Sequence, residues 1–190
     1  FVIVLLYLLT SHRFTKEDIH TKSNIKSSVQ RGLKSKFAEQ FPLLNPVIDD
    51  IIPKKSQMIH IKCEEKISLY AIDDTVVVYQ IKDELFPSLH VVHKYPQLFH
   101  TVQVDRGAIK FVLGGANIMC PGLTSKGAQL PEGDELHKDD VVIVKAEGKE
   151  NALAVGKLVM DVQDIKNLNK GIGIELIHYL GDGLWNLSLM

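Results

Sequence analysis

The sequence contains little cysteine, which narrows the class of protein. Cys63 and Cys120 are the only two cysteines among 190 residues, and they are not clustered as in metal sites or disulfide frameworks. We therefore expect two reduced, buried thiols in a cytosolic protein rather than a disulfide.

Positive charge is not in excess either. The net charge is -1, so any RNA contact must come from a local basic patch rather than from the whole protein. One segment is locally basic, because between Arg13 and Lys36 only Glu17 and Asp18 oppose a series of lysines and arginines. Such a segment is typical of a solvated helix face, and alternatively of an RNA or ribosome contact.

A long apolar run is also missing. The stretch from Phe1 to Leu9 is apolar but falls short of the about 20 residues that cross a bilayer. It has the length of a signal-peptide core, but no basic region precedes it and no clear cleavage site follows. We expect residues 1–12 to be an atypical leader outside the fold, either a gene-prediction artefact or a disordered extension. A secretory or membrane-tethered protein is the alternative.

Motifs of catalysis and cofactor binding are absent. Gly171-Ile172-Gly173 has Leu176 where a dinucleotide fingerprint needs a third glycine, and there is no P-loop, Gly-x-Ser-x-Gly or His-Glu-x-x-His motif. His90 and His93 share a helix face, but no cysteine or carboxylate cluster completes a metal site. We expect a protein that is not an enzyme and that has no cofactor and no metal.

The first half of the chain predicts a small α+β domain over residues 13–96. Apolar residues at four-residue spacing predict a helix over 21–41 with Ser23 as its N-cap. Short helices are expected over 46–52 and 86–94, and alternating apolar residues predict strands over 59–63, 67–71 and 76–81. The domain boundary is expected between Pro96 and Gln103.

The second half, over residues 97–190, predicts a small closed or half-closed barrel. Its short apolar runs predict strands over 141–146, 152–160 and 171–179, with a loop over 124–140 and a polar segment over 161–170. Gly173 within a strand indicates a close backbone approach or a bulge.

One stretch, Val104 to Leu123, organises this half. Asp105 is a good N-cap, and Gly114-Gly115 a good stop, for a helix over 106–113. A strand over 117–120 and a tight turn at Pro121-Gly122 should follow.

This run resembles the opening of the PUA domain, an RNA-binding pseudo-barrel. The resemblance to the malignant T-cell amplified sequence family extends over roughly residues 13–187. It rests on QFPLL (40–44), IIPKK (51–55), HKYP (93–96), GANIMCPGLTS (115–125) and NKGIGIELIHYLGDGLW (169–185). It implies an α+β N-terminal domain followed by a mainly-β PUA pseudo-barrel.

The resemblance also implies a binding site. PUA domains bind RNA along the groove between this helix and the following strand and loop. Carried onto this sequence, the RNA-binding residues are Arg106, Gly107, Ala108, Lys110, Gly115, Ala116 and Lys126. Packing alone would also explain the small residues among them.

The implied function is that of a cytoplasmic, non-enzymatic translation factor. Family members pair with density-regulated protein and act on the small ribosomal subunit in re-initiation and recycling, with release or recruitment of tRNA. Lys26, Arg31 and Lys34 are the candidate ribosome contacts. The alternatives are a stand-alone RNA-binding adaptor for tRNA or rRNA modification, and a membrane-tethered protein.

Overall fold

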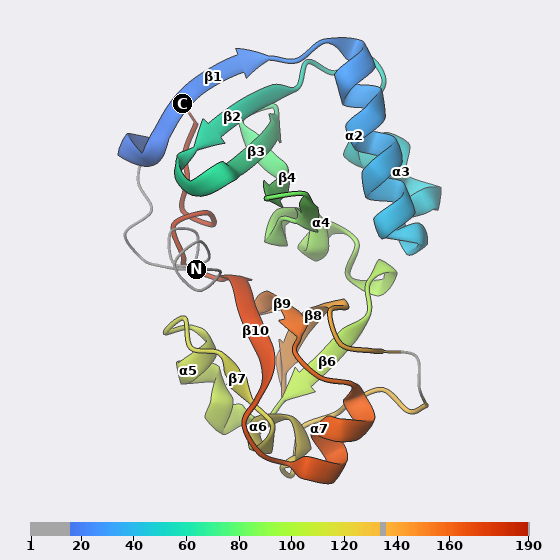
Figure 1. Cartoon of the computed structure of the whole chain (residues 1–190), viewed down its shortest axis with the longest axis vertical. Coiled ribbons are helices and arrows are strands. Elements are labelled where there is room, and N and C mark those ends of the chain that lie inside the picture. The colour runs from blue at the N-terminus through green and yellow to red at the C-terminus, as the bar shows by residue number, and fades with distance from the viewer. Residues whose placement is uncertain (1–15, 134–135, 190) are drawn as a thin grey trace. The chain divides into compact units, whose positions relative to one another are not determined.

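The computed structural model describes residues 16–133 and 136–189, which form two compact units. The first unit runs to Phe99 and also contains residues 187–189, and the second runs from His100 to Asn186 (Figure 1). The leader expected over 1–12 lies outside the described residues. Within those residues, no helix is long and apolar enough to cross a membrane.

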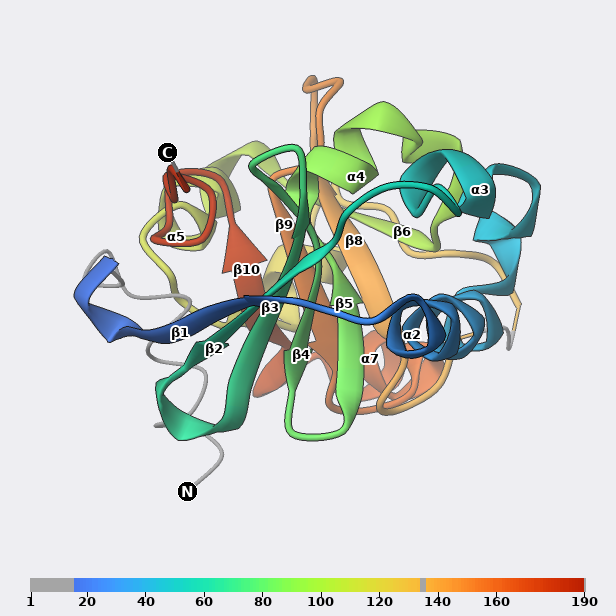
Figure 2. The same cartoon turned by 90° about the horizontal axis from the view of Figure 1, so that it is seen from above.

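The first unit is built on an antiparallel sheet with the strand order β1-β2-β3-β4-β5 (Figure 2). The strands are β1 (Ile19–Asn24), β2 (Ile59–Cys63), β3 (Ile67–Ile72), β4 (Thr75–Ile81) and β5 (Glu84–Pro87), and the helices are α2 (Ser27–Gln40), α3 (Ile48–Ile51) and α4 (Leu89–Lys94). Phe37, Leu69 and Tyr79 are fully buried between them. The predicted α+β character of this half is confirmed.

The start of α2 differs from the prediction. Residues 21–24 belong to β1, which pairs with β2, so the helix begins at Ser27 and Ser23 does not cap it. The predicted apolar stripe is also shifted. Steps of four residues advance about 40° around a helix, so Val29 falls off the stripe and is 53% exposed, while Gln30 is buried beside Leu33 and Phe37.

Gln40, at the end of α2, covers the outer edge of the sheet. Its side-chain amide donates to the Leu85 carbonyl at 2.7 Å and accepts from the Leu85 N–H at 3.2 Å. One side chain therefore satisfies both the N–H and the carbonyl group of Leu85 on the edge strand β5. Unpaired backbone groups on an edge strand can otherwise form hydrogen bonds with a strand of another chain.

The second unit is a half-barrel with the strand order β6-β8-β9-β10-β7. Its strands are β6 (Thr101–Val104), β7 (Ile118–Met119), β8 (Val141–Ala146), β9 (Ala154–Leu158) and β10 (Ile172–Tyr179), and its helices are α5 (Ile109–Val112), α6 (Pro121–Thr124) and α7 (Val162–Leu168). β6 and β8 are parallel, and the other neighbours are antiparallel. The predicted mainly-β half-barrel is confirmed.

Two connections in this unit are helical where the sequence predicted none. Residues 161–170 contain α7, which buries Val162 and Ile165 and ends at Asn169 in the left-handed conformation. Pro121-Gly122 begins the one-turn helix α6 rather than a tight turn, because proline suits the first position of a helix as well as a turn.

The expectation for Gly173 is confirmed. A Cβ atom at this position would lie 2.9 Å from Leu123 Cδ1, and the pairing of β10 with β7 shifts register between Ile172 and Ile174. Cys63 and Cys120 are also free and buried, as expected.

Candidate nucleic-acid interface

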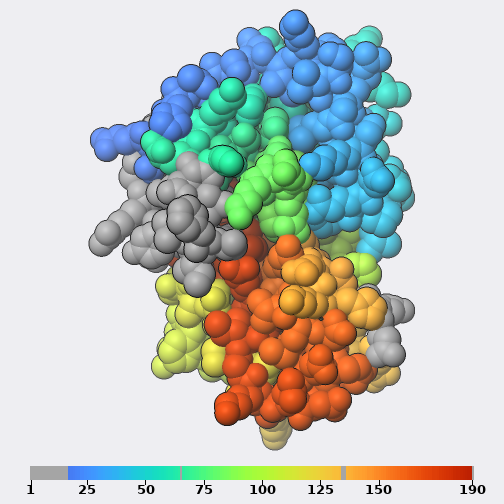
Figure 3. All heavy atoms as spheres, viewed as in Figure 1, coloured from blue at the N-terminus to red at the C-terminus, as the bar shows by residue number. Residues whose placement is uncertain are grey.

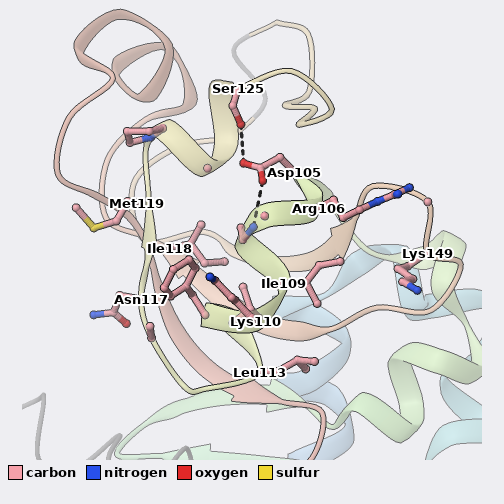
Figure 4. A pocket seen from close by; sticks show the side chains of 18 residues that line it. Asp105, Arg106, Ile109, Lys110, Leu113, Asn117, Ile118, Met119, Ser125 and Lys149 are labelled. Carbon is pink, nitrogen blue, oxygen red and sulfur yellow. Dashed lines mark hydrogen bonds between the residues drawn. The ribbon is translucent and has the colours of Figure 1, made fainter.

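The second unit carries a groove of about 1460 Å³ beside α5 and β7 (Figure 4). Its walls come from the 3-10 turn η5 (Arg106–Ala108), α5, β7, the start of α6 and the turn between β8 and β9. In the space-filling view, α5 and β7 belong to the yellow part of the surface (Figure 3). Most of the lining is apolar.

Asp105 fixes the entrance to the helix. One carboxylate oxygen accepts from the Ala108 N–H at 3.1 Å, and the other accepts from the Ser125 hydroxyl at 2.6 Å. The Ser125 hydrogen bond, followed by the backbone N–H groups of Ala108 and Gly107, lowers the pKa of Asp105 below its ordinary value. The predicted N-cap is confirmed, and the same carboxylate ties η5 to the segment after α6.

Gly107 and Gly115, two of the small residues, are glycines for structural reasons that do not involve a ligand. A Cβ atom on Gly107 would lie 2.9 Å from Asp105 Oδ1, so a side chain there would disturb the cap. Gly115 has φ +81°, and its Cβ would lie 3.0 Å from the Tyr179 hydroxyl. Both glycines are thus required by backbone geometry and packing, whatever the groove binds.

Asn117 attaches β7 to the rest of the sheet. Its side-chain oxygen accepts from the Leu176 N–H of β10 at 2.9 Å. Because β7 has only two residues, this extra bond helps to hold the wall of the groove in place.

Three basic side chains line the groove: Arg106, Lys110 and Lys149. All three are exposed, and in the part of the chain that the structure describes none forms an ion pair. Lys110 Nζ lies 4.8 Å from the centre of the Phe111 ring, within the range of a cation–π contact. The groove therefore offers three cationic side chains that form no ion pair with a described acid, and Asp105 is the acidic residue of its lining.

Two large apolar side chains are exposed at the groove. Phe111 is 58% exposed and Met119 is 49% exposed. An exposed aromatic ring beside cations is a typical binding surface for single-stranded RNA. A base can stack on the aromatic face while its phosphate binds a positive charge.

The structure brings together five of the seven RNA-binding residues implied by the resemblance. Arg106, Gly107, Ala108, Lys110 and Ala116 line the groove, whereas Gly115 and Lys126 do not.

Sequence reasoning missed several lining residues, which include Phe111, Asn117, Met119 and Lys149. The sequence did contain a signal for Phe111, because this apolar residue lies off the apolar stripe of its own helix and is therefore expected to be exposed. It contained no signal for Lys149, because only the fold of the sheet brings the β8–β9 turn beside Arg106.

The three candidate ribosome contacts of the first unit differ from one another. Lys26 and Arg31 are exposed at the start of α2 and on it. The Lys34 side chain is only 16% exposed, and its ammonium group pairs with Asp49 at 2.5 Å and donates to the Ile52 carbonyl at 2.6 Å. Lys34 is thus engaged within its own unit.

Among the described residues, no group of three or more histidine, cysteine or acidic side chains could hold a metal ion.

A half-barrel with a groove between its first helix and an edge strand defines a protein of the PUA class. Residues 97–183 match the family described as "elF2D, PUA domain", and residues 14–96 match the family described as "Pre-PUA-like domain". The chain belongs to the family that contains translation machinery-associated protein 20 and the malignant T-cell-amplified sequence proteins.

The relatives cover nearly the whole chain. It is 61% identical over 178 residues to Translation machinery-associated protein 20 of Eremothecium gossypii, covering 94% of this chain and 98% of the relative. It is 47% identical over 174 residues to Malignant T-cell-amplified sequence 2 of Mus musculus, covering 91% and 94%. These relatives confirm the family resemblance seen in the sequence.

Solved structures confirm the fold. A hypothetical protein from Pyrococcus horikoshii has a TM-score of 0.70 at 20% identity, covering 88% of this chain and 99% of that one. A conserved PUA domain protein from Thermoplasma acidophilum has a TM-score of 0.64 at 23% identity, covering 86% and 97%.

Proposed function

We propose that this protein is a non-enzymatic, RNA-binding translation factor of the cytoplasm. It acts on the small ribosomal subunit in re-initiation and recycling, assists the release or recruitment of tRNA, and works as a heterodimer with density-regulated protein. The relatives support the link to translation, because the printed name of the Eremothecium gossypii protein associates it with the translation machinery.

One observation carries the RNA-binding part of the proposal. Arg106, Lys110 and Lys149 present positive charge, without ion pairs to described acids, around an apolar groove on which Phe111 is exposed. This arrangement supplies phosphate contacts and a stacking surface in one place, although the whole chain carries a net charge of -1.

The first unit supplies the proposed ribosome contact. Lys26 and Arg31 are available to phosphate groups, whereas the charge of Lys34 is compensated by Asp49. We therefore expect Lys26 and Arg31 to contribute more to ribosome binding than Lys34 does.

Co-sedimentation with purified small ribosomal subunits over a salt series tests this function, with and without density-regulated protein. Binding that the partner enhances, and that salt and Lys110→Ala weaken, supports the proposal. Tight binding to free tRNA without ribosome binding would instead favour the stand-alone RNA-binding adaptor. The exposed Lys138→Ala variant, outside the groove, is the matched control.

A further inference from the structure

The turn between β8 and β9 places a second cation beside Arg106. Glu147 and Gly148 are the central residues of this turn, which the Lys149 N–H closes by donating to the Ala146 carbonyl at 3.0 Å. Gly148 and Lys149 line the groove together with Arg106 (Figure 4). A Cβ atom on Gly148 would lie 3.2 Å from Arg106 Nη2, so the guanidinium group lies against the backbone of the turn. Two cations from separate elements thus line the same end of the groove (Figure 4).

Glu147, an acid of this turn, is bound at the backbone of Arg106 and not at its guanidinium group. Glu147 accepts from the backbone N–H of Arg106 at 3.2 Å. The same carboxylate lies against Gly127, where a Cβ atom would be 2.4 Å from Glu147 Oε2. Neither the Arg106 guanidinium nor the Lys149 ammonium group forms an ion pair with any described acid.

Gly148 leaves room for the Arg106 guanidinium group. It has φ +72° and no side chain, so no Cβ atom crowds Arg106 Nη2, and the guanidinium group can lie close to the backbone of the turn. The planar guanidinium group can form two parallel hydrogen bonds to a phosphate, and the ammonium group adds a point charge.

We propose that Arg106 and Lys149 together hold one phosphodiester group of a single RNA strand at this end of the groove. The inference rests on the proposed RNA-binding function and adds to it a residue, Lys149, and a position for one phosphate. The strand then runs along α5 and β7, with its bases over the apolar lining.

Binding of a short, fluorescently labelled oligouridylate to the full chain tests this arrangement. The dissociation constant is measured over a potassium chloride series for the wild type, for Arg106→Ala and Lys149→Ala, and for the double variant. We expect each single variant to weaken binding several-fold. The double variant should lower the slope of log affinity against log salt by about 0.7 in total, because a single-stranded phosphate contributes about that much.

Several outcomes would overturn the proposal. A slope change of about 1.4 in the double variant would mean two separate phosphates. Unchanged binding by Lys149→Ala, with loss in Lys110→Ala, would reject the shared phosphate and keep the RNA groove. Failure of the wild type to bind would reject the proposed RNA function as well. Lys138→Ala is the matched control, and equal thermal unfolding of all variants excludes misfolding as the cause.

Discussion

The Ser125 hydroxyl donates a 2.6 Å hydrogen bond to Asp105 Oδ2, and this bond joins the segment after α6 to the cap of η5, the 3-10 turn that leads into α5. The lowered pKa of Asp105 has the same origin, since the bond favours the charged carboxylate. A carboxyl group whose pKa is lower in the folded protein than in the unfolded chain stabilises the fold at pH values above its unfolded pKa. That contribution is lost as the pH falls through its folded pKa.

Ser125→Ala should therefore raise the pKa of Asp105 toward 3.8, the ordinary value. Carboxyl carbon chemical shifts over a pH titration measure this directly. Asp105→Ala should lose the cap and about 1 kcal/mol of stability at neutral pH. A wild-type pKa at or above 3.8 would contradict the assignment.

Asp182 should be among the most sensitive positions for stability. It is fully buried, and its carboxylate accepts from His178 Nδ1 at 2.6 Å and from the N–H groups of Tyr179 and Trp185 at 2.9 and 2.8 Å. Asp182→Ala leaves three donors of this buried network without their carboxylate acceptor, so we expect a loss of about 3 kcal/mol or more in urea unfolding. Exposed Asp164→Ala, on α7, should change stability by less than about 0.5 kcal/mol. Equal effects of the two variants would contradict this role.

Both thiols should react slowly in the folded protein. Burial, followed by the nearby acids Asp18 and Glu64, raises the pKa of Cys63 to about 12, and burial raises that of Cys120. At pH 8 only a small fraction of either thiol is therefore in the reactive thiolate form. We expect little alkylation by iodoacetamide at this pH, and more only at a pH well above 8. Mass spectrometry should show labelling of both residues in urea. Rapid labelling of the native protein would disprove the prediction.

Phe111→Ala should weaken RNA binding without harming the fold. Its ring is 58% exposed, so its removal leaves no cavity in the core, while one stacked base is worth about 1–3 kcal/mol. Fluorescence anisotropy with the same oligouridylate measures the loss. Leu168→Ala, which is also exposed but lies outside the groove, is the control. Unchanged affinity in Phe111→Ala would remove the ring from the binding surface.

Local signals in the sequence were enough to predict the helical segment over 106–113, which in the structure is η5 followed by α5. Asp105 supplied its cap and Gly115 its left-handed stop, and both lie within a few residues of the segment. The strands over 59–63 and 141–146 were predicted with the bounds that the structure has, because alternation or a bounded apolar run marks them clearly.

Elements that depend on distant partners were missed. β1 is exposed along almost its whole length and exists because β2 pairs with it, so its own residues carry no strand pattern. Gln30 occupies a buried position of α2 because Pro53 and Ser56 accept hydrogen bonds from its amide. The place of Lys149 in the groove likewise follows from strand pairing.

The assignment of residues 187–189 to the first unit has a consequence for biosynthesis. In chain order the second unit is an insertion, since the first unit is interrupted after Phe99 and resumes at Leu187. The Lys22 ammonium group, near the start of the described chain, donates to the carbonyl of Leu189 at 3.3 Å. A ribosome that synthesises this protein therefore completes the first unit last, after every residue of the inserted half-barrel has been made.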